Sequence, residues 1–409
     1  MVTQRAEGGD PVARALHPPR KPPRPGNVPH AILRRSSVLM FFIKFFPRLA
    51  TALIVAFSLA APSALAAEAP VRWASALDQP AGWYGTAAAR ALADNVLLYQ
   101  TVHGGWPKNT EMAEPPTAEA RAALLDPKTE ATTFDNGGTH TQLRFLARVI
   151  AARGADNPEV AAYRASFLRG VDYLLAAQYP NGGWPQFFPL RKGYYTHITF
   201  NDDAMIGVMT MLREVASGQA PYEFVGATHR ERAARAVAKG IECVLSCQVV
   251  AEGRRTAWCA QHDEVTFAPA WARAYEAPSL SGSESVGIVR FLMSIPDPSP
   301  EIVAAIEGAV AWFRAVPIRG MRVETFNGDD GKRDRRMVAD ASAPLLWARF
   351  YELGTNRPLY MGRDSIPRYD YNAVERERRA GYSYAGNWPA ALLEKDYPAW
   401  VARRRGAKN

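Results

Sequence analysis

The sequence predicts a fold dominated by α-helices: an α/α toroid of three helix pairs, (α/α)3, followed by an irregular C-terminal segment. The first observation is a repeat in which a Gln and then a Trp follow an apolar helical stretch, with Gln at 100, 178 and 248 and Trp at 106, 184 and 258. The Gln steps of 78 and 70 residues suit one helix pair with its loops, and self-similarity at such a period indicates stacked units. The second observation is that strand-like alternation is scarce before about residue 315.

Apolar residues at helical spacing mark the helices between these points. The stripes are Leu143, Leu146 and Ile150; Phe167, Val171 and Leu174; Met205, Val208 and Leu212; Val237, Ile241 and Val244; Val286, Val289 and Met293; and Ile302, Ile306 and Phe313. In a toroid, the loops at one end of the helix pairs converge on a cleft. We therefore expect the Trp loops to share a rim with the acidic loops described below.

The N-terminal part has the features of an export signal. Residues 40–66 combine Lys44 and Arg48 with an apolar stretch and an Ala-Leu-Ala cleavage motif, which predicts a cleavable signal peptide and a secreted or periplasmic protein. Residues 1–39, rich in Pro and Arg, are interpreted as a non-native or disordered extension before a true start at Met40. We expect residues 67–409 to form one α/α-toroid domain.

The formal net charge of +9 gives no support to nucleic-acid binding. Residues 1–66 carry seven of these charges, which leaves +2 for residues 67–409. Three cysteines are too few for a disulfide scaffold; one bridge is conceivable, but buried free thiols are the preferred interpretation. We expect no nucleic-acid partner, no membrane association once the signal is removed, and a monomer.

Two clusters of oxygen-bearing side chains stand just before apolar helical stripes. "FDNGG" places Asp135 and Asn136 together, and "FNDD" places Asn201, Asp202 and Asp203 together. A single Asp or Asn would suffice to cap a helix. Two clusters at equivalent points of a repeat, with carboxylate and amide oxygens but no Cys, suit Ca²⁺ or Mg²⁺ better than zinc.

Basic residues lie among aromatic residues near the same loops. They are Lys108, Arg273, Arg349 and Arg363. Cations beside a hard-metal site indicate an anionic substrate, and interleaved Trp and Tyr indicate sugar rings. A polyuronate meets both requirements.

Several blocks, in order, resemble the pectate lyases of polysaccharide lyase family 10. They are "GGWPKN", "TFDNGGTHTQLRFLARV", "YPNGGWPQFFP", "GYYTHITFNDDAM", "WCAQHD", "ARAYEAPSLSGSESVGIVRFLM" and "RFYELGTNRPLYMGRDSI", and they span roughly residues 75–398. The resemblance implies an (α/α)3 toroid and Ca²⁺-dependent β-elimination of polygalacturonate.

The resemblance also implies roles for individual residues. Asp135 and Asp202 would be the main calcium ligands, with Asn136 and Asp203 as further candidates that the sequence does not separate. Arg273 would be the Brønsted base, with Arg363 and then a carboxylate such as Asp364 as alternatives, although arginine is a poor base because its pKa is very high. We expect Arg349, Arg363, Lys108, Trp106, Trp184 and Asn201 to bind the substrate.

Three other functions compete with this interpretation. A glycoside hydrolase on the same toroid would use Asp135 and Asp202 as acid and base. "QYPNGGW" fits a motif of triterpene cyclases, although "FNDD" lacks the first Asp of their acidic motif. A non-catalytic polysaccharide-binding module would keep the aromatic residues and cleave nothing. The sequence leaves open endo or exo attack and the preference for pectate or methylated pectin.

Overall fold

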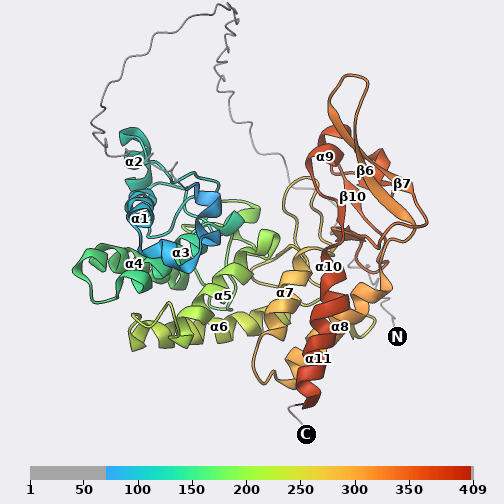
Figure 1. The fold of residues 1–409 in the computed structure, drawn as a ribbon. Helices are drawn as coiled ribbons and strands as arrows, with labels where there is room; N and C mark the ends of the chain where they lie inside the picture. Colours follow the sequence, from blue (N-terminus) through green and yellow to red (C-terminus); the bar gives the residue numbers. More distant parts are fainter. Residues whose placement is uncertain (1–70, 407–409) are drawn as a thin grey trace, which may run out of the picture. The chain divides into compact units, whose positions relative to one another are not determined.

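Paired helices form the larger part of the computed structural model, which describes residues 71–406 (Figure 1). The predicted extension 1–39 and the signal at 40–66 lie outside the described residues and stay predictions. The helices that carry the fold are α1 (Ala87–Tyr99), α2 (Ala118–Leu125), α3 (His140–Arg153), α4 (Ala161–Ala176), α5 (Ala204–Ser217), α6 (Ala227–Cys247), α7 (Glu284–Met293) and α8 (Pro300–Ala315).

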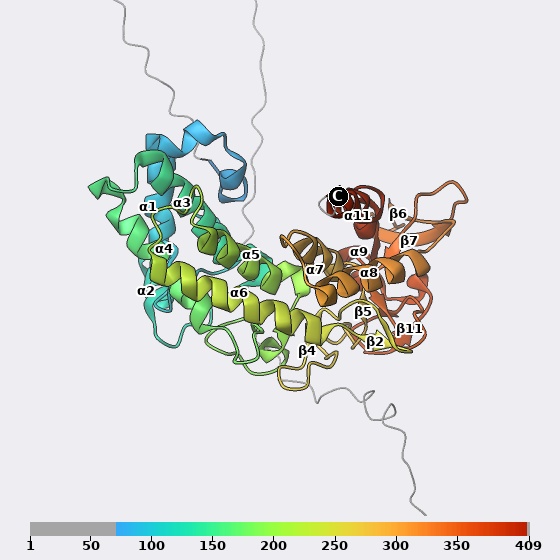
Figure 2. The same cartoon turned by 90° about the horizontal axis from the view of Figure 1, so that it is seen from below.

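Helices α3, α5 and α7 form an inner row, and each packs against an outer helix. Helix α3 contacts α4 and α5, α5 contacts α6 and α7, and α7 contacts α8. Figure 2 shows α6 beside α5, with α4 towards one of its ends and α8 towards the other. The prediction of a mostly helical fold of paired helices is confirmed, whereas closure of the row into a complete ring stays a prediction.

The predicted apolar stripes form the core between these rows. Met205, Val208 and Leu212 of α5 are fully buried. Local signals delimit the helices: Thr86 caps the start of α1 by accepting the Ala89 N–H, and Gly218, in the left-handed conformation, ends α5. Cys243, Cys247 and Cys259 are buried free thiols, as the preferred interpretation expected.

The repeated Gln performs the same task at each occurrence. Each side-chain Nε2 donates both to a carbonyl of its own loop and to a carbonyl of the next outer helix. The pairs of acceptors are Gly104 and Ser166 for Gln100 (2.6 and 2.8 Å), Gly182 and Ala236 for Gln178 (3.0 and 2.8 Å), and Thr256 and Ala305 for Gln248 (2.9 Å each). The repeat therefore ties each unit to the following one.

The repeated Trp has an equally regular role. Its Nε1 donates to a carbonyl near the end of the preceding outer helix, which is Val96 for Trp106, Leu174 for Trp184 and Val244 for Trp258. A fourth tryptophan, Trp347, donates in the same way to Phe313 at the end of α8, at 2.9 Å. The sequence pattern therefore continues once more than its spacing indicated.

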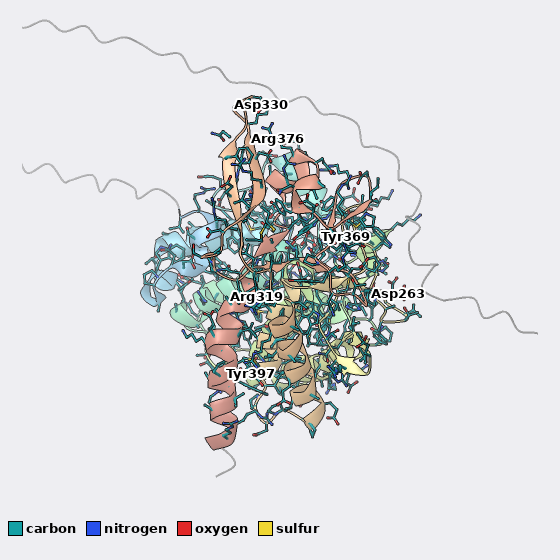
Figure 3. All side chains as sticks on the ribbon, turned by 90° about the vertical axis from the view of Figure 1, so that its right-hand side faces the viewer. Asp263, Arg319, Asp330, Tyr369, Arg376 and Tyr397 are labelled. Carbon is teal, nitrogen blue, oxygen red and sulfur yellow. The ribbon has the colours of Figure 1, made fainter. Side chains whose placement is uncertain are left out.

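The segment after residue 315 has more regular structure than predicted. Strands β6 (Met321–Asn327) and β7 (Arg333–Ala339) form an antiparallel hairpin. At its tip Asp330 pairs with Arg376, through two N–O distances of 2.9 Å (Figure 3). Three α-helices follow: α9 (Arg376–Gly381), α10 (Trp388–Ala391) and α11 (Tyr397–Gly406).

The remaining strands are two-residue ladders that fasten loops together. They are β1 (Ile198–Thr199) with β4 (Gln261–His262), β2 (Val250–Ala251) with β3 (Arg254–Arg255), β5 (Leu280–Ser281) with β9 (Phe350–Tyr351), β8 (Trp347–Ala348) with β12 (Ala385–Gly386), and β10 (Tyr360–Met361) with β11 (Pro367–Arg368). Among residues 71–406, no helix is both long and apolar enough to cross a membrane.

Candidate active site

The two acidic loops lie next to each other because the helices that they precede pack side by side. Residues 135–137 and 201–203 each form a short 3-10 turn before α3 and α5, and the two turns are in contact. Their backbones match: Asn136 has φ 49° and ψ 37°, and Asp202 has φ 50° and ψ 35°. Asn and Asp tolerate this left-handed conformation better than most residues, which partly explains the residue types.

A cleft of about 180 Å³ opens over these turns. It brings together six of the predicted site residues: Lys108, Asp135, Asn136, Asn201, Asp202 and Arg273. It also includes residues that the sequence analysis did not single out: Gln186, Phe187, Arg191, Tyr194, Tyr195, Gln261 and Glu276. The cleft is therefore lined mainly by charged and polar groups from separate parts of the chain.

Asp135 lines the cleft and is 3% exposed. Its Oδ2 is ion-paired with the Lys108 ammonium group. Its Oδ1 is buried and has no hydrogen-bond partner within the described residues, and the same holds for Oε1 of Gln186. Buried oxygens of this kind are costly unless something binds them, and they suit a hard cation or a sugar hydroxyl group.

Asp202 contributes the second carboxylate of the cleft. Its Oδ2 accepts a hydrogen bond from the Asn201 amide at 2.7 Å, and its Oδ1 lies 3.2 Å from Nη2 of Arg349. Together with Asp135 and Asn136 it offers oxygen ligands on two adjoining turns. This donor set fits Ca²⁺.

Asp203 faces a different hollow. It lines a space of about 880 Å³ with Glu284, Arg290 and Arg349, but it does not line the cleft that contains Asp135. Burial, and then the negative charges of Glu284 and Asp202, raise the pKa of Asp203 to about 6. The neighbouring candidate ligands Asp202 and Asp203 thus occupy different positions, and Asp202 is the one that lines the cleft with Asp135.

Arg273 reaches the cleft as one half of a bidentate ion pair. Its Nε lies 2.7 Å from Oε2 of Glu276, and its Nη2 donates to Oε1. Burial by itself lowers the pKa of Arg273, but the hydrogen bonds and charge of Glu276 outweigh it and raise the pKa above the ordinary value. Glu276 therefore stabilises the cationic form of Arg273.

Arg349 and Arg363 occupy contrasting environments. Arg349 is mostly buried, ion-paired with Glu284 and Asp202, and lines the larger hollow. Arg363 has a side chain that is 61% exposed, pairs with Glu377, and does not line the cleft. Its guanidinium lies 5.8 Å from the Tyr275 ring, which Arg273 also approaches at 5.1 Å.

The expectation that Trp106 and Trp184 bind substrate is wrong. Both side chains are 0% exposed, because each indole N–H is bonded to a helix carbonyl inside the core. The aromatic groups at the cleft are instead Phe187, Tyr194 and Tyr195. Phe187 lies between two cations, with Arg191 at 4.0 Å and Lys108 at 5.6 Å from its ring centre. The signal for this surface was the mixture of aromatic and basic residues in "PQFFPLRKGYY".

A separate group of possible metal ligands consists of His197, Asp263 and Glu264. His197 Nδ1 lies 2.9 Å from Glu264 Oε2. Asp263 Oδ1 accepts hydrogen bonds from the Val265 and Thr266 backbone N–H groups. These side chains satisfy one another and a turn, which accounts for their clustering.

Comparisons with known proteins identify the family to which the chain belongs. A family profile described as pectic acid lyase matches residues 100–393. A family 10 polysaccharide lyase from Cellvibrio cellulosa is 36% identical, with a TM-score of 0.65, and the match covers 77% of this chain and 94% of that one. A variant of a family 10 polysaccharide lyase from Cellvibrio cellulosa, solved in complex with trigalacturonic acid, is 35% identical, with a TM-score of 0.64 and coverage of 76% and 93%.

No curated protein sequence shows significant similarity to the chain. The family profile nevertheless spans well over half of the chain, and the structural relatives are matched over nearly their full length. The protein belongs to the pectic acid lyase family and is a polysaccharide lyase enzyme.

Proposed function

We propose that the protein is a calcium-dependent pectate lyase that cleaves polygalacturonate by β-elimination and leaves 4,5-unsaturated oligogalacturonides. The observation that carries the proposal is the cleft itself, where a buried carboxylate with an unpaired oxygen, Asp135, lies with Asp202, Lys108 and Arg273. The structural relative solved with trigalacturonic acid supports an oligogalacturonate ligand. We also propose that the helix pairs are the (α/α)3 toroid of this family and that the protein is exported and monomeric.

Calcium would be held by Asp135, Asn136 and Asp202. When bound, it would neutralise the uronate carboxylate and make the neighbouring C5 proton more acidic, which is the Lewis-acid role of a metal. Asn201 would assist by orienting Asp202 through its 2.7 Å hydrogen bond. Asp203 lines the other hollow together with Arg290 and Arg349. It would contribute negative charge there and would not bind calcium in the cleft.

The cationic side chains would bind substrate carboxylates. Lys108 is available at the cleft, and its pairing with Asp135 would weaken when calcium neutralises that carboxylate. Arg349 is similarly paired with Asp202, from the side of the larger hollow. Arg363 would contact a more distant sugar, since it stands outside the cleft. This surplus of cations favours the free acid over methylated pectin.

Arg273 would accept the C5 proton. The electron pair of the C5–H bond would form the C4–C5 double bond, and the C4–O bond would break, with the leaving oxygen taking a proton from water. Because Glu276 stabilises the cationic form, Arg273 must lose a proton before it can act. Because bound calcium would make the C5 proton more acidic, a weaker base would suffice for this step.

The alternatives fit the cleft less well. A glycoside hydrolase needs one carboxylic acid free to protonate the leaving oxygen, but Asp135 and Asp202 are both paired with cations. A cyclase needs an apolar cavity, whereas this cleft is lined by charged groups. A non-catalytic binding module does not agree with membership of a lyase family.

The test uses the chain expressed from Ala67 and incubated with polygalacturonate. Ultraviolet absorbance of the unsaturated product should rise, stop when a chelator is added and resume when calcium is restored. Reducing ends that appear without this absorbance would show hydrolysis and contradict the proposal. Absence of both products would contradict pectate as the substrate.

A further inference from the structure

Glu276 is a buried carboxylate whose hydrogen-bonding capacity is filled by two residues. The residue is 3% exposed. Its Oε2 accepts from the backbone N–H of Arg273 at 3.1 Å and from Arg273 Nε at 2.7 Å, and its Oε1 accepts from Arg273 Nη2 and from the Tyr382 hydroxyl at 2.8 Å. A buried charge is tolerated only with such complete pairing.

This pairing occupies one edge of the Arg273 guanidinium. A guanidinium bound through Nε and Nη2 presents its third nitrogen, Nη1, on the opposite edge. No described residue is paired with Nη1. The Glu276 backbone N–H also donates to the Arg273 carbonyl at 2.8 Å, so the main chain and the side chain hold the same short loop.

Tyr382, which does not line the cleft, supports Glu276 through its hydroxyl group. Its ring stacks on Phe350 at 6.2 Å and meets Tyr275 edge-on at 5.2 Å. The guanidinium groups of Arg273 and Arg349 lie 5.6 and 5.1 Å from the same ring. Tyr382 therefore has little freedom to move, and its hydroxyl fixes the carboxylate of Glu276.

We propose that Glu276, fixed by Tyr382, is a positioning residue that aims Nη1 of Arg273 at the substrate. The proposal rests on the proposed function, in which Arg273 acts on the C5 proton. Glu276 acts only through Arg273 and touches no reacting atom. Misplacing a reacting group by about 1 Å can cost about 100-fold in rate, which sets the expected effect.

The chain contains a matched control for this arrangement. Arg144 binds Glu214 through the same two nitrogens, with Nε at 3.0 Å and Nη2 at 3.2 Å, and the Tyr222 hydroxyl donates to Glu214 at 2.6 Å. None of these three residues lines the cleft. Glu214→Gln therefore removes a carboxylate charge from a cluster of the same three residue types outside the cleft, where the Glu214 side chain is more exposed than that of Glu276 (33% against 4%).

The experiment compares Glu276→Gln, Tyr382→Phe and Glu214→Gln in steady-state lyase assays at saturating calcium. Glu276→Gln should lower kcat about 100-fold with KM within about twofold. Tyr382→Phe, which loses one hydrogen bond, should lower kcat about fivefold. Glu214→Gln should leave both constants unchanged. Equal effects of Glu276→Gln and Glu214→Gln, or an effect on KM alone, would overturn the proposal.

A double-mutant cycle tests whether Glu276 acts through Arg273. Lysine cannot form the two-nitrogen pair, so Glu276→Gln should have little further effect on kcat once Arg273→Lys is present. An undiminished effect in that background would show that Glu276 acts by another route and would overturn the proposal.

Calcium affinity, measured by titration calorimetry, should be equal in all variants. Failure of the proposed function is a distinguishable result, because the unmodified protein would then show no calcium-dependent lyase activity.

Discussion

The two acidic turns have the same backbone conformation, but their carboxylates are buried to different extents. Asp135 in the first turn corresponds to Asn201 in the second, and Asn136 corresponds to Asp202. The inner position is buried in both turns, so the first turn has a buried carboxylate and the second a buried amide. The carboxylate of Asp202 is correspondingly more open, with 38% of its side chain exposed.

This difference indicates how a repeated scaffold becomes an asymmetric site. In each unit the Trp carbonyl accepts a hydrogen bond from a Thr N–H two residues before the inner position, from Thr133 to Trp106 and from Thr199 to Trp184. This backbone hydrogen bond is the same in both units. The ion pairs differ, because Asp135 pairs with Lys108 and Asp202 pairs with Arg349. The cleft therefore has one buried and one more exposed carboxylate.

The largest effect is expected from Asp135→Asn, which makes both inner positions amides. Calcium binding should be lost at millimolar concentrations, and lyase activity should fall about 1000-fold, since the metal supplies several kcal/mol of transition-state stabilisation. Calorimetry and the absorbance assay would measure the two effects, with exposed Asp126→Asn as the control. Unchanged calcium affinity would show that the inner carboxylate does not bind the metal.

Trp106→Ala should weaken the packing beneath the first turn, although the Trp106 main-chain carbonyl remains. Loss of a fully buried indole costs about 3–5 kcal/mol of unfolding free energy. Denaturant unfolding would measure it. The KM of the protein that remains folded should not change, because the ring cannot reach the substrate. A large rise in KM with unchanged stability would restore Trp106 as a sugar contact.

The double variant Asp135→Asn with Asn136→Asp gives the first turn the order of the second. Because the backbones match, the melting temperature should change by only a few degrees, while kcat should fall about 100-fold as the carboxylate moves away from its position. The assay and thermal unfolding are measured on the same samples. Wild-type activity would mean that the depth of the carboxylate is unimportant.

Acid should destabilise the packing beneath both turns. Burial lowers the pKa of His140, at the start of α3, to about 3, and that of His262, whose ring meets Phe200, to about 4. The folded protein thus binds fewer protons than the unfolded chain below pH 6.5, so stability is lost as pH falls from 6.5 towards 4. The loss is about 1.4 kcal/mol per pH unit for each histidine. Denaturation at pH 7 and 5 would measure it, and His262→Gln should reduce the slope.

The smallest effect is expected from Arg363→Ala. Its exposed pair with Glu377 contributes little to stability. A rise in KM of about threefold, with kcat unchanged, is expected for a cation that binds a distant sugar. A large fall in kcat would instead support Arg363 as the base.

The sequence was most informative where a residue repeats a physical task. Gln100, Gln178 and Gln248 recur at a readable spacing because each bridges the same two elements, and the helical stripes are visible because one face is buried. Trp347 was missed because the β6–β7 hairpin separates it from the earlier Trp residues. Glu276 and Gln186 were missed because single polar residues in loops have no period.

Trp106 and Trp184 were assigned wrongly because a Trp beside glycines resembles an exposed sugar platform, and the sequence does not reveal the bond to a helix carbonyl.

The hydrogen bonds of Gln100, Gln178 and Gln248 that join neighbouring units have a consequence for how the protein unfolds. Each Nε2 group joins a loop of one unit to an outer helix of the next, at Ser166, Ala236 and Ala305. A chain cut at a unit boundary would leave a buried amide and a helix carbonyl without partners at the new end. The units therefore do not behave as interchangeable modules. Amide hydrogen exchange in α4, α6 and α8 should occur through one common opening, with similar protection in all three helices.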